Sequence, residues 1–316
     1  LRLLFVPEKI QCLHFFLHCA AAEHNVFQIQ DHNEQQLTEL MVGEKVTLDI
    51  KRDFVEEKHK RLEVKHLTVK NIDGKKVVDD ISFDLYSGEI LGIAGISGSG
   101  QKELLEAIMG LQECEEGSSV IYNSTAHGVH ELVGLSTKEI IAHGLHLAFV
   151  PEDRLGMGLV GNMGMTDNVM LKHYRKGNGP FLHRKKPEET AQKIKDELEV
   201  VTPDLEYPVR KLSGGNVQKV LVGREIASAP KVLLTAYAVR GLDINSSHMI
   251  YDLINQQKQK GVAVIYVGED LDVLLELCDR ILVLCAGKVS GIIPGRGAKK
   301  RDVGMMMTRL GGDNHA

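Results

Sequence analysis

The stretch ILGIAGISGSGQKELLEAIMG, residues 90–110, predicts the central unit of the fold. Its first part, ILGIAG, is an apolar run short enough for a buried strand. A glycine-rich loop follows at 95–100, and Leu104, Leu105 and Ile108 then recur at helical spacing. We therefore expect a strand, a glycine loop and a helix in direct succession.

The glycine loop has the length and setting of a phosphate-binding loop, because glycines let backbone N–H groups curl round a phosphate at a helix N-terminus. The full motif also needs a lysine for the phosphates and a hydroxyl for Mg²⁺. Gln101 and Lys102 stand at these two positions. Taken alone, the loop fits either a nucleotide site or a plain strand-to-helix turn. The candidate nucleotide-binding residues are Gly95, Ile96, Ser97, Gly98, Ser99, Gly100, Gln101, Lys102 and Glu103.

Outward from this unit, the chain alternates between strand and helix patterns. Buried strands that alternate with amphipathic helices indicate a parallel sheet covered on both faces. We expect strands at 61–70, 75–86, 231–236, 261–268 and 279–285, further helices at 35–41, 187–200, 214–227, 245–260 and 269–278, a hairpin at 286–288 and a tail helix at 302–310.

A second motif, LSGGNVQK at 212–219, opens one of the predicted helices. Ser213, Gly214 and Gly215 present a hydroxyl and free N–H groups to an anion, with the helix dipole behind them. An ordinary helix N-cap is the alternative. The predicted strand downstream and the run Arg240-Gly241-Leu242-Asp243 after it favour the functional interpretation.

Together these motifs resemble the nucleotide-binding domain of ABC transporters. LSGG followed by Gln218 looks like the family's signature, Gly241-Leu242-Asp243 looks like its D-loop, and the motifs occur in the family's order. The resemblance covers about residues 60–310. It implies an α/β fold, an ABC-type P-loop domain over 60–312. That domain would have a RecA-like core, an antiparallel β subdomain and a helical subdomain at about 152–212 with the groove for a membrane subunit.

Further detail narrows the resemblance. Phe149-Val150-Pro151-Glu152-Asp153-Arg154 and Asn216 resemble the second ATPase domain of the two-domain ATPases that serve sugar and nucleoside importers. TAYAVRGLD, 235–243, most resembles the nucleoside, or basic-membrane-protein, branch. Residues 36–59 resemble the tail and linker of a preceding ABC domain, whereas residues 1–35 form an atypical segment outside the family pattern. We therefore expect a fragment of a longer chain.

Departures from the family pattern fall at the catalytic positions. Where the family has an Asp for Mg²⁺ and a Glu for the attacking water, this chain has Ala236 and Tyr237, which can neither ligate Mg²⁺ nor act as a base near neutral pH. Glu269 stands in place of a switch His, and Glu152 in place of a Gln. The adenine-stacking aromatic is missing from 61–78. We predict no catalytic and no metal-binding residue, weak ATP binding, and only weak support for Mg²⁺ in this half.

The intact signature implies an asymmetric pair of domains. In ABC dimers the signature of one domain closes over the nucleotide held by the other, so this domain would supply its signature in trans to a catalytic partner. The signature residues are Leu212, Ser213, Gly214, Gly215, Asn216 and Gln218, and the loop and dimer contacts are Glu152, Asp243 and Glu269.

The resemblance also implies a setting. The expected function is that of the ATP-binding subunit of an ABC importer for nucleosides or simple sugars, peripheral on the cytoplasmic face of the cell membrane. Its partners would be a second ABC ATPase domain fused upstream, membrane permease subunits and, indirectly, an extracellular substrate-binding protein. Whether this half is itself an enzyme stays open.

Three alternatives stand beside this interpretation. One is a non-catalytic scaffold or regulatory ABC module that binds a partner ATPase without turnover. Another is a soluble ABC protein of translation or DNA repair, which needs two intact sites and a long charged helix or a coiled-coil arm. The third is a truncated or frameshifted gene product, which the atypical first 35 residues keep open.

Composition excludes several other classes of function. The chain has 38 Lys and Arg against 43 Asp and Glu, a net charge of −5, so we expect no nucleic-acid partner, which usually needs a basic surface. No stretch reaches the ~18 consecutive apolar residues of a membrane-spanning helix. Cys12, His14, His18 and Cys19 match no common zinc spacing. Five cysteines without a regular framework indicate a reduced, intracellular chain.

Overall fold

The computed structural model describes residues 50, 55, 58–124, 128–173 and 182–309. All of them belong to one compact unit, Asp49–Ala316. The atypical segment 1–35, the helix predicted at 35–41, most of the linker 36–59 and the cysteine–histidine cluster lie outside the described residues.

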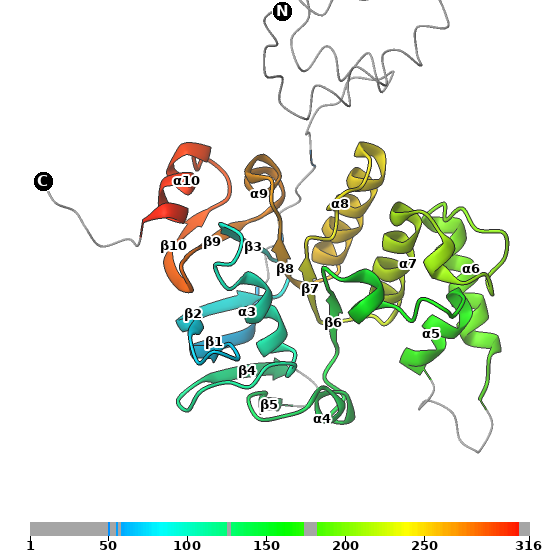
Figure 1. Cartoon of the computed structure of the whole chain (residues 1–316), viewed down its shortest axis with the longest axis horizontal. Coiled ribbons are helices and arrows are strands. Elements are labelled where there is room, and N and C mark those ends of the chain that lie inside the picture. Colours follow the sequence, from blue (N-terminus) through cyan, green and yellow to red (C-terminus); the bar gives the residue numbers. More distant parts are fainter. Residues whose placement is uncertain (1–49, 51–54, 56–57, 125–127, 174–181, 310–316) are drawn as a thin grey trace, which may run out of the picture. The chain divides into compact units, whose positions relative to one another are not determined.

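A six-stranded sheet lies at the centre of this unit, in the order β10-β9-β3-β8-β7-β6 (Figure 1). β10 returns antiparallel to β9 through the predicted hairpin, and the other five strands are parallel. Their continuous apolar runs suit strands buried on both faces. The bounds are β3 Ile90–Gly95, β6 Leu147–Val150, β7 Val232–Ala236, β8 Ala263–Val267, β9 Arg280–Cys285 and β10 Lys288–Pro294.

A second, antiparallel sheet has the strand order β2-β1-β4-β5. β1 and β2 match two of the predicted strands, whereas β4 and β5 lie where the sequence analysis made no prediction. The bounds are β1 Lys60–Lys70, β2 Lys76–Tyr86, β4 Ser119–Ser124 and β5 Gly128–Glu131.

The helices of the last third lie close to their predicted bounds, and α7 matches its prediction residue for residue. Two helices that were not predicted, α4 and α5, lie between β5 and α6 in the chain. The bounds are α3 Gln101–Ile108, α4 Thr137–Ala142, α5 Met165–His173, α6 Lys185–Glu197, α7 Gly214–Ala227, α8 Ile244–Gln259, α9 Leu271–Leu277 and α10 Lys300–Thr308. None of the described helices combines the length and apolar character needed to cross a bilayer.

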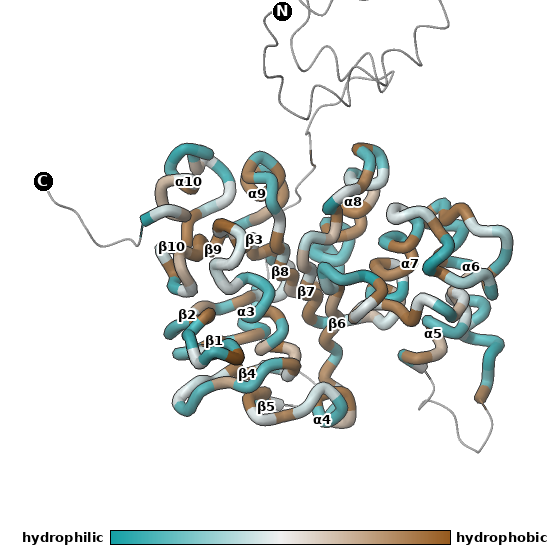
Figure 2. Tube along the Cα trace, viewed as in Figure 1, coloured by the Kyte–Doolittle hydropathy of each residue, from teal (hydrophilic) through white to brown (hydrophobic). Residues whose placement is uncertain are grey.

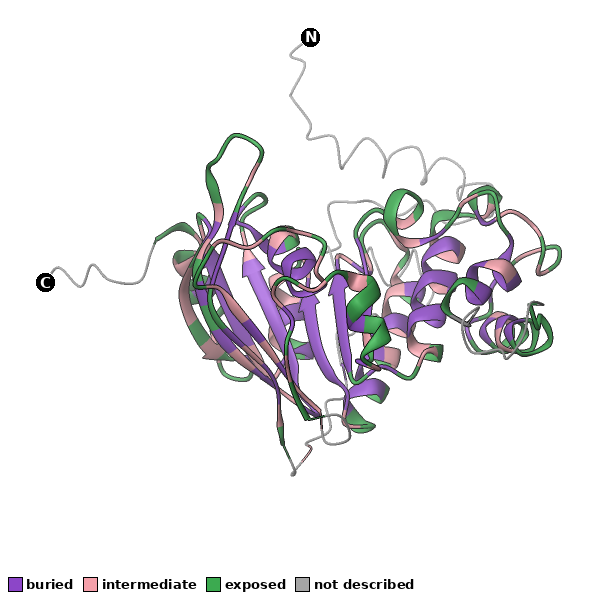
Figure 3. Cartoon of the chain, turned by 90° about the horizontal axis from the view of Figure 1, so that it is seen from below, coloured by how far each residue is buried: buried purple, intermediate pink, exposed green. Residues whose placement is uncertain are grey.

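Two apolar cores hold these layers together, one on each face of the parallel sheet. Val232 and Leu234 of β7 point into the core shared with α3 and the antiparallel sheet, whereas Leu233 between them points into the core under α7, α8 and α9. Successive side chains of a strand alternate between faces, so an unbroken apolar run serves both cores. The central strands are accordingly apolar (Figure 2) and buried (Figure 3).

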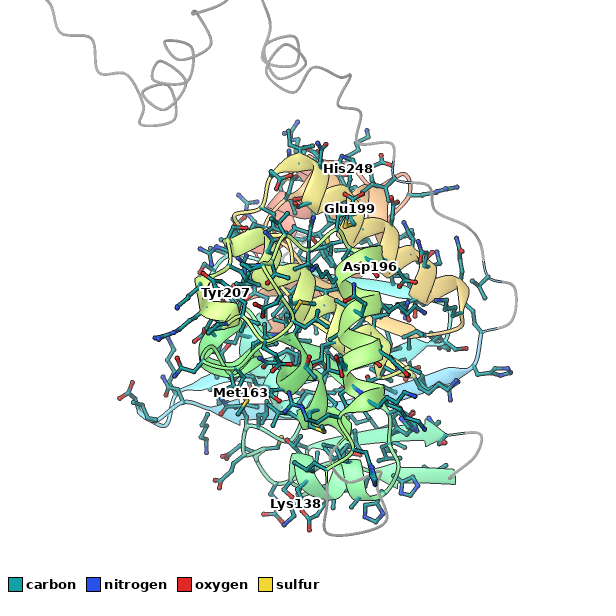
Figure 4. The ribbon with its side chains drawn as sticks, turned by 90° about the vertical axis from the view of Figure 1, so that its right-hand side faces the viewer. Lys138, Met163, Asp196, Glu199, Tyr207 and His248 are labelled. Carbon is teal, nitrogen blue, oxygen red and sulfur yellow. The ribbon has the colours of Figure 1, made fainter. Side chains whose placement is uncertain are left out.

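The middle of the chain forms the expected helical part. The short π-helical turn η2 (Arg154–Gly158), then α5, α6 and the 3₁₀ turn η3 (Val209–Lys211) all lie within 152–212. α5 and α6 pack on each other and on α7. This side of the unit faces the viewer in Figure 4, where Met163, Asp196, Glu199 and Tyr207 are labelled. The predicted α/β fold, with an antiparallel β part and a helical part, is confirmed.

This topology positions the candidate site. The carboxyl ends of parallel strands lie at one edge of a sheet, where ligands bind in open α/β folds. The loops after β3, β6, β7 and β8 therefore meet at that edge. They carry, in turn, the glycine loop, Glu152, the segment from Tyr237 to Arg240, and Glu269.

Candidate nucleotide-binding site and signature

The glycine loop joins β3 to α3 and has the backbone geometry of a phosphate cradle. Gly98 and Gly100 have φ angles of +84° and +93°, which glycine adopts without strain. A Cβ at Gly100 would lie 2.3 Å from the Val77 carbonyl oxygen, whereas at Gly98 it would meet nothing within 4 Å. Ile96 and Ser97 are exposed, and the free N–H groups of the first turn of α3 follow directly. The backbone therefore fits a phosphate group.

The side chains of this loop do not supply the cation that the full motif needs. Gln101 is 3% exposed, and its Nε2 donates across the loop to the Ile96 carbonyl at 3.1 Å. Lys102 is exposed on α3, with its Nζ 3.8 Å from Glu106 Oε1. A neutral amide thus occupies the lysine position, so the loop offers a backbone cradle without its usual charge.

The end of β7 offers neither a metal ligand nor a base. Ala236 is buried, and Tyr237 follows it at φ +53° with its N–H donated to the Val267 carbonyl at 2.9 Å. Burial raises the pKa of the Tyr237 hydroxyl, and the nearby carboxylates of Glu152, Glu269 and Glu103 raise it further, while Arg240 opposes them. The phenol therefore stays protonated near neutral pH. The end of β7 thus offers Mg²⁺ no ligand, and among the described residues no group of three or more His, Cys, Asp and Glu could hold a metal ion.

An arginine that the sequence analysis gave no role joins the two acidic replacements. Arg240 Nη1 pairs with Glu152 Oε1, and its Nε lies 3.2 Å from Glu269 Oε1. The guanidinium also lies 5.9 Å from the centre of the Tyr237 ring. Glu152 and Glu269, which replace the expected Gln and His, are therefore bridged within this chain. Arg240 belongs to the run RGLD in the sequence, but no local sequence pattern indicates which loops its side chain connects.

The signature turn has the predicted form at the N-terminus of α7. Ser213 caps the helix, with its Oγ accepting from Asn216 N at 3.4 Å and from Asn216 Nδ2 at 2.9 Å. Because that oxygen accepts both bonds, its own proton is free to be donated outward. Gly214 and Gly215 have ordinary backbone angles, and a Cβ on either would find nothing nearer than 3.2 Å. The fold itself does not require glycine there, so the bare turn leaves room for a ligand's close approach.

The remaining signature residues, Leu212, Asn216 and Gln218, are less exposed than Ser213 and connect the turn to the rest of the domain. Asn216 Oδ1 accepts from Val201 N at 3.0 Å, which ties the turn to the segment that follows α6. Gln218 is 1% exposed, and its Nε2 has no hydrogen-bond partner among the described residues. Leu212 packs against the core under α7. Ser213 and Gly214 are thus exposed, Leu212, Gly215 and Asn216 are partly buried, and Gln218 is buried.

Asp243, predicted as a dimer contact, caps α8. Its Oδ1 accepts from Ser246 N at 2.9 Å and its Oδ2 from Ser246 Oγ at 2.7 Å. The Ser246 hydroxyl, and then the Ser246 N–H, lower the pKa of this carboxyl. Its role at a domain interface stays a prediction.

Asp243→Ala is expected to cost about 1 kcal/mol of unfolding free energy at neutral pH, because a helix cap is lost. Since the pKa is lowered in the folded state, the carboxylate stabilises the fold above its ordinary pKa of about 3.9 and loses this effect as the pH falls through the lowered value. Urea unfolding from pH 7 to pH 3 should show the difference between variant and parent shrinking toward acid. A difference independent of pH would contradict a role for the ionised group.

Fold and motifs together define a P-loop nucleotide-binding domain of the cassette type. The chain belongs to the ABC transporter family, whose family model, described as "ABC transporter", matches residues 78–235. A dimeric bacterial ABC transporter cassette has a TM-score of 0.64 at 22% identity, over 75% of this chain and 100% of that one. An ATP-binding cassette dimer in a post-hydrolysis state with ADP and Pi gives 0.63 at 22%, with the same coverage. These likenesses confirm the fold.

Curated relatives are import ATP-binding proteins. The guanosine import ATP-binding protein NupO of Bacillus subtilis (strain 168) is 31% identical over 284 residues, 88% of this chain and 54% of that protein. The nucleoside import ATP-binding protein NupA of Lactococcus lactis subsp. cremoris (strain MG1363) is 33% identical over 283 residues, 89% and 54%. The xylose import ATP-binding protein XylG of Thermoanaerobacter pseudethanolicus is 34% identical over 272 residues, 84% and 52%. The chain spans about half the length of the curated relatives it matches.

Proposed function

We propose that this chain is the degenerate second ATPase domain of an ABC importer for nucleosides or simple sugars. It supplies its signature to a nucleotide held by a catalytic partner domain. The observation that carries this proposal is an asymmetry within one chain. The signature turn at Ser213 is exposed and well formed. By contrast, the chain's own glycine loop lacks the lysine of the full motif, and the end of β7 lacks the Asp and Glu that the family has there.

The signature turn suits a phosphate that is presented by another molecule. Ser213 has a free hydroxyl proton, and the first N–H groups of α7 have no acceptor within the helix. The helix dipole adds a partial positive charge at the same point. These groups would donate to the outer phosphate oxygens of ATP bound in the partner, where negative charge must be stabilised during phosphoryl transfer.

The chain's own loop is proposed as a weak ATP site. The backbone cradle is intact, while Ala236, Tyr237 and Glu269 take the places of metal ligand, base and switch residue. Mg²⁺, when it accompanies bound ATP, would supply charge neutralisation, but this chain offers it no carboxylate at the end of β7. Such a site holds nucleotide without turning it over.

The proposed partners are inferred from the names of the relatives and from the length of the match. Their names describe import of guanosine, nucleosides and xylose, and a match over 89% of the chain is longer than residues 60–316 can supply. It therefore extends into the linker 36–59, which supports a catalytic ABC domain fused upstream. Permease subunits and, through them, an extracellular substrate-binding protein would complete the importer, with this domain peripheral on the cytoplasmic face of the membrane.

Exposed apolar side chains on the segment after β6 support contact with a permease. Leu155, Met157, Val160 and Met163 follow one another after β6, and each is 36% exposed or more. Exposed apolar side chains that form a contiguous patch mark interaction sites. They lie on the segment that the resemblance assigns to the groove for a membrane subunit.

A second candidate is a regulatory scaffold that binds a partner ATPase without itself holding nucleotide. The bridge of Arg240 between Glu152 and Glu269 favours it. The charged groups at the edge of the site are already paired within the chain, so no bound nucleotide is needed to balance them. The two candidates differ in whether ATP binds the glycine loop.

Calorimetry with ATP, and phosphate release with Mg²⁺, on the isolated chain test both candidates. We expect weak binding without turnover. Ser97→Asp, which places a negative charge in the exposed part of the loop, should abolish that binding. The absence of any binding would favour the scaffold, whereas robust turnover would overturn the reading of Gln101, Ala236, Tyr237 and Glu269 as disabling.

A further inference from the structure

Arg154 joins three segments that are far apart in the sequence. It is the first residue of η2, just after β6, and is half-buried. Its Nη1 donates to the Gly214 carbonyl at 3.1 Å, and its Nη2 donates to the Arg240 carbonyl. Gly214 opens the signature helix, and Arg240 lies in the loop between β7 and α8. One guanidinium thus holds the signature turn and the loop after β7 together.

Within the part of the chain that the structure describes, the positive charge of Arg154 is not paired with a carboxylate. Among the described residues, no carboxylate lies within ion-pair distance of it, and both of its acceptors are backbone carbonyls. Burial accordingly lowers the pKa of the guanidinium. A guanidinium offers donors in a rigid fork, so its two terminal nitrogens can hold the two carbonyls in a fixed arrangement. Geometry therefore explains this arginine better than charge pairing does.

Arg240 connects this clamp to the chain's own nucleotide site. Its carbonyl accepts from Arg154, while its side chain is held between Glu152 and Glu269 at the edge of the glycine-loop site. Each ion pair is partly exposed, and a single exposed pair contributes little to stability. Held from two sides, however, the guanidinium fixes the conformation of the loop that carries the Arg240 carbonyl.

We propose that Arg154 and Arg240 are positioning residues that couple this chain's own glycine-loop site to its signature. Glu152 and Glu269 hold the Arg240 side chain, the Arg240 carbonyl anchors Arg154, and Arg154 holds Gly214 at the start of α7. A change at the edge of the glycine-loop site that releases the Arg240 side chain from these carboxylates therefore reaches the signature turn through Arg154. The importance of that turn to a partner rests on the proposed function, but the coupling is a property of this chain alone.

Substitution of Arg154 is structurally mild. A cavity of about 330 Å³ borders it, with Leu155, Arg210 and Leu212 among its other walls. A shorter side chain therefore enlarges an existing hollow instead of opening a void in a core. The substitution is therefore expected to change the local positions of the bonded segments without lowering the global stability, which distinguishes a positioning role from a stabilising one.

Hydrogen–deuterium exchange of the full 316-residue chain tests the clamp. In Arg154→Ala, the amides at 215–218 should exchange roughly tenfold faster, because charge-assisted bonds to Gly214 and Arg240 are lost. The second half of α7 and the unfolding midpoint should stay unchanged. Arg154→Lys should resemble the alanine variant. The matched control is Arg184→Ala, which removes an exposed arginine that pairs with Asp167 and Glu206 and should leave 215–218 unchanged.

The coupling itself is tested by a change that leaves Arg154 in place. Glu152→Gln combined with Glu269→Gln removes both carboxylates that hold Arg240, and exchange at 215–218 should rise severalfold. A purely local contact of Arg154 predicts no change there. Unchanged exchange in Arg154→Ala overturns the clamp, and unchanged exchange in the double variant overturns the coupling. Neither readout uses nucleotide or a partner, so a failure of the proposed function would be seen separately in the binding and turnover assays.

Discussion

ATP turnover by the assembled two-site ATPase is expected to fall on the order of 100-fold or more when Gly214 of this chain is replaced by aspartate. The carboxylate would stand at the N-terminus of α7 and occupy the N–H groups that await a phosphate. It would also repel the negative charge of the nucleotide presented by the partner. The loss should appear in kcat, because the interaction strengthens as charge develops during transfer.

The same substitution should leave the fold intact. A Cβ at Gly214 would lie 3.2 Å from Arg154 Nη1, which can move slightly, and an acidic residue in the first turn of a helix is favourable. Thermal unfolding should therefore show no loss of stability in the variant that has lost activity. Gly304→Asp on α10 is the matched control, because a Cβ there meets nothing within 4 Å, and it should leave turnover unchanged. Normal turnover in the Gly214 variant would rule out a working signature in trans.

Glu225→Ala is expected to produce the largest loss of stability, about 3–5 kcal/mol in urea unfolding. The Glu225 side chain is 0% exposed, with Lys172 Nζ 2.9 Å from Oε2 and Arg224 Nη2 2.7 Å from Oε1. Phe149 N also donates to it, at 3.4 Å. Without this carboxylate, the buried guanidinium of Arg224 is left without its counter-charge, which costs far more than an ordinary hydrogen bond.

Glu197→Ala is the matched control for that measurement. Glu197 and Lys193 form an exposed pair on α6, 3.5 Å apart and one helical turn from each other. Such pairs contribute about 0.3–0.5 kcal/mol, so this variant should unfold almost as the parent does. A loss below about 1 kcal/mol for Glu225→Ala would mean that water reaches Arg224 and replaces the carboxylate.

The buried cluster around Glu225 also bears on the signature. Arg224 Nη2 donates to the Gly158 carbonyl at 2.7 Å as well as to Glu225. The signature helix α7 is thereby joined to the end of η2, the same turn that begins at Arg154. α7 is therefore attached to this turn at two points, one in the buried cluster and one at its exposed N-terminus. A stability defect in Glu225→Ala should be accompanied by faster exchange along the whole of α7.

Much of the architecture was predictable because it depends on neighbouring residues. The apolar run at 90–95, the loop at 95–100 and the helix after them appear as β3, the cradle and α3. The unbroken apolar runs of the last third predicted a parallel sheet, and the sheet has five parallel strands. The elements β4, β5, β6, α4 and α5 received no prediction. Each spans nine residues or fewer, and few residues give a weak periodic signal.

The candidate site was predictable only in part. The sequence placed Ser213 at a helix start and Gln101 in the loop, and the structure shows how each side chain is held. It placed Gln218 beside the signature surface, whereas helical periodicity turns that side chain into the core. Glu152 and Glu269 were recognisable as departures from the family pattern, but no local sequence pattern indicates that one arginine binds both.

What the sequence determined by itself is therefore local: the glycine loop between a strand and a helix, the helix start at Ser213, and the residue types Gln101, Ala236 and Tyr237, each set by a few consecutive residues. Only the tertiary structure decided which loops meet. Arg154 and Gly214 are 60 positions apart, and Glu152 and Arg240 are 88 apart. Their contacts exist because β6, β7 and β8 lie side by side in one parallel sheet, an order set by the packing of whole elements and encoded in no single segment.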